Sequence, residues 1–463
     1  MPIIIPANSA AGGVFDVDNS IRFNGTNQYL SRTISSASTP TKLTTSFWVK
    51  RSKLGATQRI VTQNNTGGSN NFYWRFETDD KLVFWNQING STTWADIKTN
   101  RLFRDTSAWY HICCVWDSTQ GTQANRMKLY VNGVQETSLE TNTYPSQNTT
   151  FGGFANTSCK IDVGYYRTSN IEYYSGYLSE FVIADGQALA PTDFGEFDED
   201  SGIWKAKAIS GLTFGTNGSY LNFKSSSELG TDVSGNSNTF TENNLTAVAQ
   251  STDTCTNNFS TINPLIVMNT DTVYSEGNLI MTPGGNTGNW QIGFSSIAVS
   301  VGKWYVETKM IGGNYVNGIS ETTSNQLSAS GPEHFIGGFT KEIGYYSQSG
   351  NKFVENSQSS YGASYTNGDI IGMALDLDSG TRTITFFKNG ASQGAITLPT
   401  SMETMTFGMS VNQGSSSAQF NFGNPPFSIS SGNTDANDFG NFEYAPPSGH
   451  LALCTKNLSE ALS

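Results

Sequence analysis

The chain has 463 residues, a length that indicates roughly two to four domains. It carries 26 Lys and Arg against 38 Asp and Glu, a net charge of −12, and only 14% of its residues are charged. This acidic balance argues against nucleic-acid binding and against a polybasic membrane surface, since both need clustered Lys and Arg. No run approaches the ~18–20 consecutive apolar residues of a membrane span, so we expect no membrane insertion.

The first 18 residues form an arm of small and apolar residues in which Ile3, Ile4 and Ile5 stand between two prolines. The arm has no basic region and is not expected to be a signal peptide. It also has too few large side chains to fold alone. Three adjacent isoleucines in extended backbone cover both faces of a strand, so we predict that this triplet anchors the arm in another subunit or a partner protein.

Apolar side chains recur along the chain with a period of two, as in Met127, Leu129 and Val131. This alternation is typical of antiparallel strands that have one buried face. Several strands end in Asn-Gly, the pair best suited to a two-residue hairpin turn, most clearly at residues 132–133 and 389–390. Only residues 190–195 are typical of a short helix. The sequence therefore predicts an all-β fold.

Two dense sets of strands divide the chain into five segments. We predict an arm at 1–18, a first β-sandwich at 19–200, a polar bridge at 201–265 that packs partly on the first sandwich, a second β-sandwich at 266–425, and a C-terminal tail at 426–463. The bridge is thinner in apolar residues and rich in Ser, Asn and Thr, as a connecting segment commonly is.

The first strand set resembles the laminin-G/concanavalin-like lectin family. Five segments carry the resemblance, in the order found in the family: Ile21–Leu30, Thr45–Lys50, Trp109–Asp117, Met127–Val134 and Tyr174–Ile183. The resemblance implies an antiparallel two-sheet jelly roll over about 180 residues.

The second strand set resembles the SPRY family. The segments that carry this resemblance are Trp304–Glu307, Phe335–Phe339, Gly368–Asp378 and Ile384–Gly390. The most specific signal is Gly-Asp-Ile-Ile-Gly followed by the hairpin Phe-Phe-Lys-Asn-Gly. It implies a second two-sheet sandwich, and because SPRY domains bind through variable loops, no binding residue is transferred.

Two further phrases, Thr252–Pro264 and Pro447–Leu458, resemble segments of virion proteins of tailed phages, especially marine ones. The resemblance implies a non-enzymatic structural protein located in the virion as a fibre, spike or capsid-surface appendage. Its partners would be other virion proteins and host-surface glycans, bound through loops, and a homo-oligomer, a trimer by analogy, is expected. The alternatives are a capsid cement protein that binds no glycan and a lectin-fold glycan depolymerase.

One cluster of carboxylates is a candidate catalytic site. Glu196, Asp198 and Asp200 share one face if their segment is a strand, as the paired carboxylates of lectin-fold glucanases do. The glucanase motif ends in Glu, however, whereas this run ends in Asp200 and follows a turn. We therefore predict a solvated acidic turn and no catalytic residue.

Metal and thiol chemistry is also not expected. The chain has three histidines and five cysteines, and Cys113 and Cys114 lie in an apolar run as small buried hydrophobic residues. Laminin-G-like domains sometimes hold Ca²⁺, and Asp117, Asp162 and Asp185 fall near strand ends, but no run spells a calcium loop. We expect no cofactor, with Ca²⁺ as the alternative.

Two clusters of aromatic residues are candidate ligand sites. Tyr345, Tyr346, Tyr361 and Tyr365 occupy framework positions of SPRY domains and are expected to serve packing. The other cluster falls in a less regular segment, where aromatic rings and polar groups together are typical of binding sites. The predicted ligand-binding residues are Tyr165, Tyr166, Arg167, Asn170, Tyr173 and Tyr174. The alternative for them is packing or a subunit contact.

Deletion of residues 2–12 tests the predicted anchor. We expect both sandwiches to fold normally and incorporation into particles to be lost, because burying each isoleucine contributes roughly 1.5–3 kcal/mol to docking. Circular dichroism and particle incorporation are the two measurements. Normal incorporation of the shortened chain would remove the anchoring role.

Overall fold

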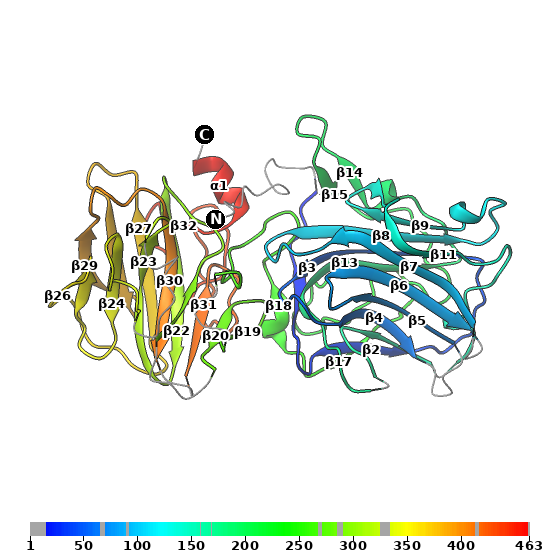
Figure 1. The fold of residues 1–463 in the computed structure, drawn as a ribbon, viewed down its shortest axis with the longest axis horizontal. Coiled ribbons are helices and arrows are strands. Elements are labelled where there is room, and N and C mark those ends of the chain that lie inside the picture. The colour runs from blue at the N-terminus through cyan, green and yellow to red at the C-terminus, as the bar shows by residue number, and fades with distance from the viewer. Residues whose placement is uncertain are drawn as a thin grey trace. The chain divides into compact units, whose positions relative to one another are not determined.

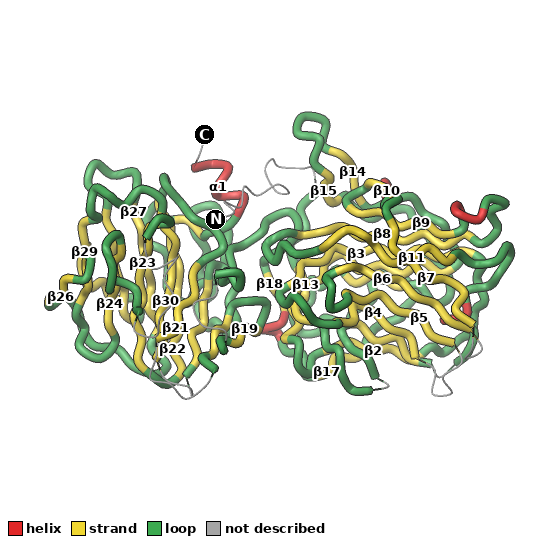
Figure 2. The backbone as a smooth tube through the Cα atoms, viewed as in Figure 1, coloured by secondary structure: helices red, strands yellow, loops and turns green. Residues whose placement is uncertain are grey.

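The computed structural model describes residues 15–64, 70–88, 92–157, 159–167, 169–266, 271–284, 290–324, 334–412 and 416–461. The predicted anchor Ile3, Ile4 and Ile5 lies outside the described residues. The chain forms two compact units that meet in sequence between Thr256 and Asn257 (Figure 1). Strands make up 45% of the chain and helices 4%, so the all-β prediction is confirmed (Figure 2).

The first unit is a sandwich of two antiparallel sheets, named sheets A and B. Sheet A contains, in spatial order, β10 (Val134–Gln135), β9 (Met127–Val131), β8 (Trp109–Asp117), β3 (Lys42–Arg51), β13 (Ser175–Asp185), β1 (Ser20–Asn24) and β18 (Gln250–Ser251), with β16 (Ser219–Leu221) paired to β13. Sheet B contains β11 (Leu139–Thr143), β7 (Thr92–Leu102), β6 (Lys81–Ile88), β5 (Asn70–Phe76), β4 (Gln58–Asn64), β12 (Lys160–Val163), β2 (Tyr29–Thr33) and β17 (Thr241–Asn243). The segment predicted as a bridge thus supplies β16, β17 and β18 to this unit.

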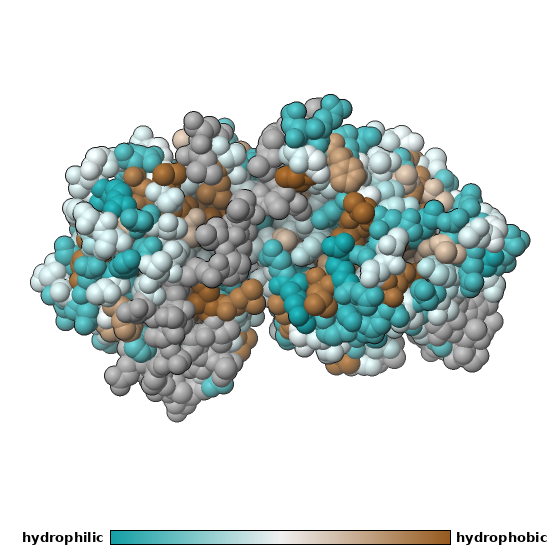
Figure 3. Space-filling model, turned by 45° about the horizontal axis from the view of Figure 1, so that its top comes forward, coloured by the Kyte–Doolittle hydropathy of each residue, from teal (hydrophilic) through white to brown (hydrophobic). Residues whose placement is uncertain are grey.

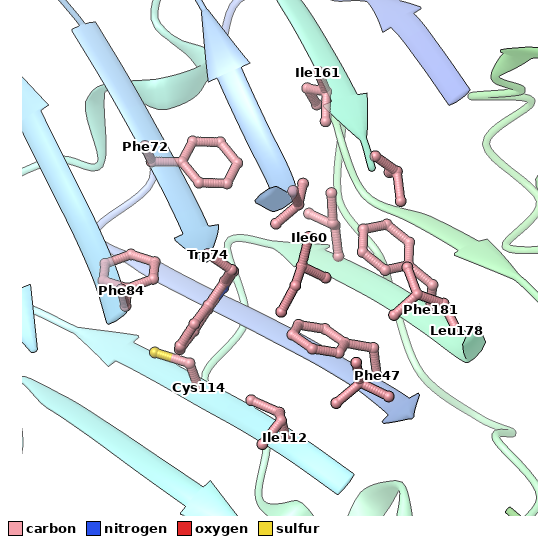
Figure 4. Packing of buried hydrophobic residues seen from close by; sticks show 14 of the residues in the cluster. Phe47, Ile60, Phe72, Trp74, Phe84, Ile112, Cys114, Ile161, Leu178 and Phe181 are labelled. Atoms are coloured by element: carbon pink, nitrogen blue, oxygen red, sulfur yellow. The ribbon is translucent and has the colours of Figure 1, made fainter. Parts of the chain in front are cut away.

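Alternation along each strand builds the core between these sheets. Phe72, Trp74 and Phe76 on β5 are fully buried, whereas Tyr73 and Arg75 between them point outward. Figure 4 shows Phe47, Trp74 and Phe181 converging from the two sheets. The Trp74 indole N–H donates to Thr45 Oγ1 at 3.0 Å, which satisfies the one polar atom of that ring.

The outer face of sheet A is covered by chain from the connecting segment. Trp204 lies on β15 (Trp204–Ala206), which pairs with β14 (Gly195–Phe197), and its indole N–H donates to His111 Nδ1 at 3.1 Å. His111 is fully buried, and burial lowers its pKa to about 3, so the ring is neutral and Nε2 donates to Ser46 Oγ at 2.8 Å. Cys255 packs in the same outer cluster.

A buried ion pair holds the end of the connecting segment on that face. Asp253 is 0% exposed and accepts from Lys50 Nζ at 2.7 Å and from the Trp109 indole N–H at 3.0 Å. Its backbone carbonyl accepts from Ser20 Oγ at 2.6 Å. The first half of the phrase Thr252–Pro264 is therefore a structural attachment within the first unit.

The second unit is also a two-sheet sandwich, formed by sheets C and D. Sheet C contains β19 (Val273–Ser275), β20 (Ile280–Thr282), β31 (Ser417–Asn421), β22 (Lys303–Ile311), β27 (Ile370–Asp376), β28 (Thr383–Lys388) and β29 (Ala391–Thr397), with β32 (Leu451–Ala452) parallel to β22. Sheet D contains β21 (Trp290–Phe294), β30 (Met405–Asn412), β23 (Asn314–Glu321), β24 (Glu342–Tyr346), β25 (Lys352–Val354) and β26 (Ser357–Ser359).

Short helical turns complete the two units. They are η1 (Gln123–Asn125), η2 (Gly152–Phe154), η3 (Pro191–Asp193), η4 (Ala247–Ala249) and α1 (Thr455–Ala461). The turn η3 confirms the helix predicted near residues 190–195, whereas α1 was not predicted.

The second half of the segment Thr252–Pro264 and the segment Pro447–Leu458 pack on each other over sheet C. Phe259 and Cys454 form a β-bridge, and Thr455 N donates to Asn258 O at 3.0 Å. Phe259 and Phe442 are buried against Tyr305 of β22. The polar tail is thus part of the folded second unit.

A buried carboxylate fixes the tail to the middle of β22. The two oxygens of Glu307 accept from the backbone N–H groups of Glu443 (2.9 Å) and Tyr444 (2.8 Å), and from Asn421 Nδ2 (3.1 Å). Glu307 is 0% exposed, and burial raises its pKa to about 7 against the opposing effect of these donors.

Independent folding of the second unit is the first prediction from this fold. Residues 257–463 alone should unfold in one cooperative denaturant transition. A fragment starting at residue 266 lacks the buried Phe259 and should lose about 3–5 kcal/mol, the usual cost of removing a buried Phe side chain. Phe259→Ala in the longer fragment should reproduce much of that loss, whereas Val273→Ala, at a 56% exposed position, should change little. Absence of a cooperative transition in residues 257–463 would contradict the boundary.

The pH dependence of the second unit is the second prediction. Because the folded pKa of Glu307 lies above its unfolded value of about 4.3, the folded state holds an extra proton between these values. The free energy of unfolding of residues 257–463, minus that of the Glu307→Gln variant, should therefore fall by about 2–3 kcal/mol as pH rises from 5 to 8. Denaturant titrations at several pH values measure this difference, and a flat difference curve would show that Glu307 ionises normally.

Candidate functional site

The segment after β12 folds back over the outer face of sheet B. Tyr166 and Ile171 pair as an isolated bridge, and Asn170 and Glu172 adopt left-handed backbone with φ of 53° and 59°. Arg59 on β4 fixes the returning segment: its backbone N–H donates to Glu172 O at 2.9 Å, and its Nε donates to Glu172 Oε2 at 2.5 Å. The segment therefore lies directly beside β4.

Three tyrosines form what we name the tyrosine column. The ring of Tyr165 stacks between Tyr29 of β2, at a centroid distance of 4.3 Å, and Tyr173, at 4.8 Å. The hydroxyls of Tyr165 and Tyr173 both donate to Asn170 Oδ1, at 2.8 and 2.9 Å. Tyr165 is 6% exposed as the middle ring, while the two outer rings are half-buried.

Arg167 lies beside this column. It forms a two-pronged ion pair with the fully buried Asp162 of β12, Nε to Oδ2 at 3.0 Å and Nη2 to Oδ1 at 2.6 Å. Its guanidinium carbon is 5.7 Å from the ring centroids of Tyr29 and Tyr165. Burial opposes the charge, but Asp162 outweighs it and raises the pKa of Arg167, so the guanidinium stays charged.

A second array, which we name the cation–aromatic stack, runs across neighbouring strands. Trp85 of β6 and Tyr73 of β5 are register partners and stack at 4.9 Å with an interplanar angle of 18°. The guanidinium carbon of Arg59 follows, 3.9 Å from the Tyr73 centroid and 4.3 Å from the Tyr166 centroid. The stack thus reads Trp85, Tyr73, Arg59, Tyr166.

A β-bulge explains why Arg59 points outward into this stack. The register of β4 with β5 shifts between Arg59 and Val61, so that the successive residues Ile60 and Val61 are both buried in the core. The extra residue resets the alternation and turns the Arg59 side chain to the outer face.

The three guanidinium groups beside the aromatic rings of this face are paired with carboxylates. Arg59 pairs with Glu172, Arg167 with Asp162, and Arg75, whose guanidinium carbon is 4.7 Å from the Tyr73 centroid, with Glu77. Asp96, the register partner of Trp85, has a pKa raised by burial. Three guanidinium groups therefore face four carboxyl groups. In the view of Figure 3, hydrophobic residues of the first unit form separate patches between hydrophilic ones.

The structure brings most of the predicted ligand residues to this face. Tyr166, Arg167, Asn170 and Tyr173 lie at the surface, and Tyr165 is wedged between two rings. Tyr174 lies instead in the core at 0% exposure, and its hydroxyl donates to Lys50 O at 2.8 Å. Its ring is therefore not available to a ligand on this face.

Four residues of the face were not singled out from the sequence: Tyr29, Arg59, Tyr73 and Trp85. Tyr73 carried a usable signal, because an aromatic residue at an outward position of an alternating strand is not needed for the core. Arg59 and Trp85 reach Tyr73 from the two neighbouring strands, and Tyr29 joins the tyrosine column from β2.

The acidic run near residue 198 is the solvated turn predicted from sequence. Asp198 forms an ion pair with Lys205 and accepts from Ser201 N at 2.8 Å and Ser201 Oγ at 2.6 Å. Glu196 is exposed on the hairpin of β14 and β15. Lys205 and Ser201 lower the pKa of Asp198, which is therefore ionised.

The three aspartates considered for Ca²⁺ lie at separate places. Asp117 accepts from Thr119 Oγ1 and Gln120 Nε2, Asp185 accepts from Ser38 Oγ and Asn217 N, and Asp162 is held by Arg167. Within the described ranges, no group of three His, Cys, Asp or Glu side chains is arranged to hold a metal ion.

No helix of the described part of the chain is long and apolar enough to cross a membrane.

The remaining sequence expectations concern packing. Tyr345 and Tyr365 are core residues of the second unit, at 0% and 4% exposure, as predicted. Cys113 and Cys114 are buried thiols whose pKa values are raised by burial.

Comparison with known proteins identifies both domains. Residues 24–193 match the family profile of the concanavalin A-like lectin/glucanases superfamily, in its laminin-G form, and residues 279–425 match that of the SPRY domain. The chain therefore contains a concanavalin-like domain and a SPRY domain, which confirms both resemblances; both are folds of the binding type. No curated protein sequence matches the chain.

Solved structures similar to parts of the chain include two SPRY domains and a pentraxin. A human SPRY domain is 16% identical (TM-score 0.26), with 32% of this chain and 94% of that chain covered. The SPRY domain of human HERC1 is 19% identical (TM-score 0.29), with 34% and 96% covered. A native heptameric SAP-like pentraxin from Limulus polyphemus is 21% identical (TM-score 0.29), with 38% and 80% covered.

Proposed function

We propose that this chain is a non-enzymatic adhesion protein of a tailed-phage virion that binds host-surface glycans. The observation that carries the glycan-binding part is the outer face of sheet B, where the cation–aromatic stack and the tyrosine column leave half-buried aromatic rings at the surface. Aromatic surface with a few placed polar groups is characteristic of binding sites.

The contrast between the two outer faces of the first unit supports the same proposal. On sheet A the outward aromatic residues Trp48, Trp109 and Tyr177 are covered by the connecting segment and are at most 2% exposed. On sheet B the outward Tyr73 and Trp85 keep part of their surface. Their exposure is therefore a property of this face and not of outward aromatic residues in the unit as a whole.

The virion setting rests on the resemblance of residues 252–264 and 447–458 to tailed-phage proteins. In this setting the partners are other virion proteins, and the chain is a homo-oligomer, with a trimer proposed by analogy. Weak single sites suffice on a particle, because multivalency raises avidity ~10²–10⁴-fold.

Two alternatives make different demands on the first unit. A cement protein would use the outer face of sheet B as a subunit contact instead of a glycan site. A depolymerase would need two carboxylates about 5–5.5 Å apart, or further for inversion, across a cleft. Asp198 is held by Lys205 and Ser201 in a hairpin, which disfavours the run 196–200 for that role.

Incubation with host-surface polysaccharide tests the proposal. The purified chain should be retained on immobilised polysaccharide through its aromatic surface and should release no reducing ends, because Asp198 of the acidic run is held by Lys205 and Ser201. Turnover that disappears in the Glu196→Gln variant would establish the depolymerase alternative. Absence of retention would favour the cement alternative, and antibody labelling of particles would test the location separately.

A further inference from the structure

We infer that the outer face of sheet B binds an uncharged polysaccharide, held by ring contacts across strands β6 to β2. This inference rests on the proposed glycan-binding function and adds the site and the chemical class of the ligand. Four steps of strand order separate β6 from β2, which at the usual strand spacing is roughly 19 Å. That length suits several consecutive sugar units lying across the strands.

The neutrality of the ligand is inferred from the guanidinium groups that lie beside the rings. Each of the three guanidinium groups is already matched by a carboxylate of the same face, and Asp96 adds a further acidic group beside Trp85. An anionic sugar that contacted the rings and these guanidinium groups would have to displace one of the three ion pairs, in a chain whose net charge is −12. A neutral sugar leaves all of them intact.

Arg59 packs between the rings of the cation–aromatic stack and is not expected to contact the ligand. Its side chain is 5% exposed, and its Nη1 atom has no hydrogen-bond partner among the described residues. The rings of Tyr73 and Tyr166 on its two sides stabilise the charge by cation–π contact. Arg59 is thus a positioning residue that holds the two rings apart at a fixed distance.

The rings themselves are the expected ligand contacts. Five aromatic residues of this face are half-buried, so part of each remains at the surface: Trp85, Tyr73, Tyr166, Tyr29 and Tyr173. Burial raises the pKa of Tyr73, so its hydroxyl stays protonated and able to donate. Because the rings are already stacked, binding orders few side chains.

Affinity electrophoresis of the full chain provides the test. The gels would contain a neutral β-glucan, mannan or galactan, or the anionic polysaccharides alginate or hyaluronan. We expect retardation by at least one neutral polysaccharide and by neither anionic one. The retardation should change less than twofold between 50 and 500 mM NaCl, because screening acts on charges.

Variants then assign the site. Trp85→Ala and Tyr166→Ala should each weaken retardation at least tenfold, Trp85→Phe should retain most of it, and the matched control Tyr346→Ala, a half-buried tyrosine of the second unit, should leave it unchanged. Unchanged thermal unfolding of each variant excludes misfolding. If one alanine variant is unstable, the other alanine variant, compared with the aromatic replacement Trp85→Phe, still tests the site.

The outcomes separate this inference from the proposed function. Binding that persists in all face variants, or binding only of anionic polysaccharide with strong salt dependence, would overturn this inference while leaving glycan adhesion standing. Failure of the chain to bind any polysaccharide or host cells would overturn both. A change of oligomeric state in Trp85→Ala, measured by sedimentation, would assign the face to a subunit contact and overturn the inference.

Discussion

The two-residue period of antiparallel strands is the constraint on which the rest of this structure depends. When one side of a strand is buried, every second side chain along the strand points outward. Each sandwich therefore has two outer faces, and each must be polar, be covered by other chain segments or contact a partner. In the first unit the outer face of sheet A is covered by Trp204 and Cys255 of the connecting segment. The outer face of sheet B carries the cation–aromatic stack. One unit therefore shows two solutions to the same geometrical demand.

Buried carboxylates attach the covering segments to the sheets. In the first unit, Asp253 accepts hydrogen bonds from Lys50 and Trp109. In the second unit, Glu307 accepts hydrogen bonds from two backbone N–H groups of the tail. Removing one partner from such a buried group leaves an uncompensated charge or donor and typically costs about 3–5 kcal/mol for an ion pair. The polar residues around Asp253 and at positions 443–444 are therefore explained by packing.

Periodicity and turn pairs sufficed to predict the strands, because each depends only on neighbours in sequence. The core triplet Phe72, Trp74 and Phe76 and the hairpin at Asn132–Gly133 are examples. The outer face of sheet B, the candidate site, could be predicted only in part. Its loop was visible as an irregular aromatic segment, but Tyr29, Arg59 and Trp85 join it through strand register and through a bulge, which no local pattern reports. Tyr174 directly precedes β13, where a shift of one residue decides whether a side chain faces the core or the outside. The helix α1 is too short for its apolar residues to show a clear period.

The choice of arginine within the stack has a physical consequence for recognition. A planar guanidinium can lie flat between two rings and still donate to a carboxylate at its edge, as Arg59 does with Glu172, whereas the compact ammonium of a lysine cannot do both. The Arg59 guanidinium is thereby packed between the rings, and Glu172 neutralises its charge. For the glycan binding proposed above, such a face would distinguish ligands by the fit of their apolar surfaces and hydroxyl groups against the rings. The selectivity of that binding should accordingly depend on the spacing of the rings on the two sides of Arg59 more than on the ionic strength of the surroundings.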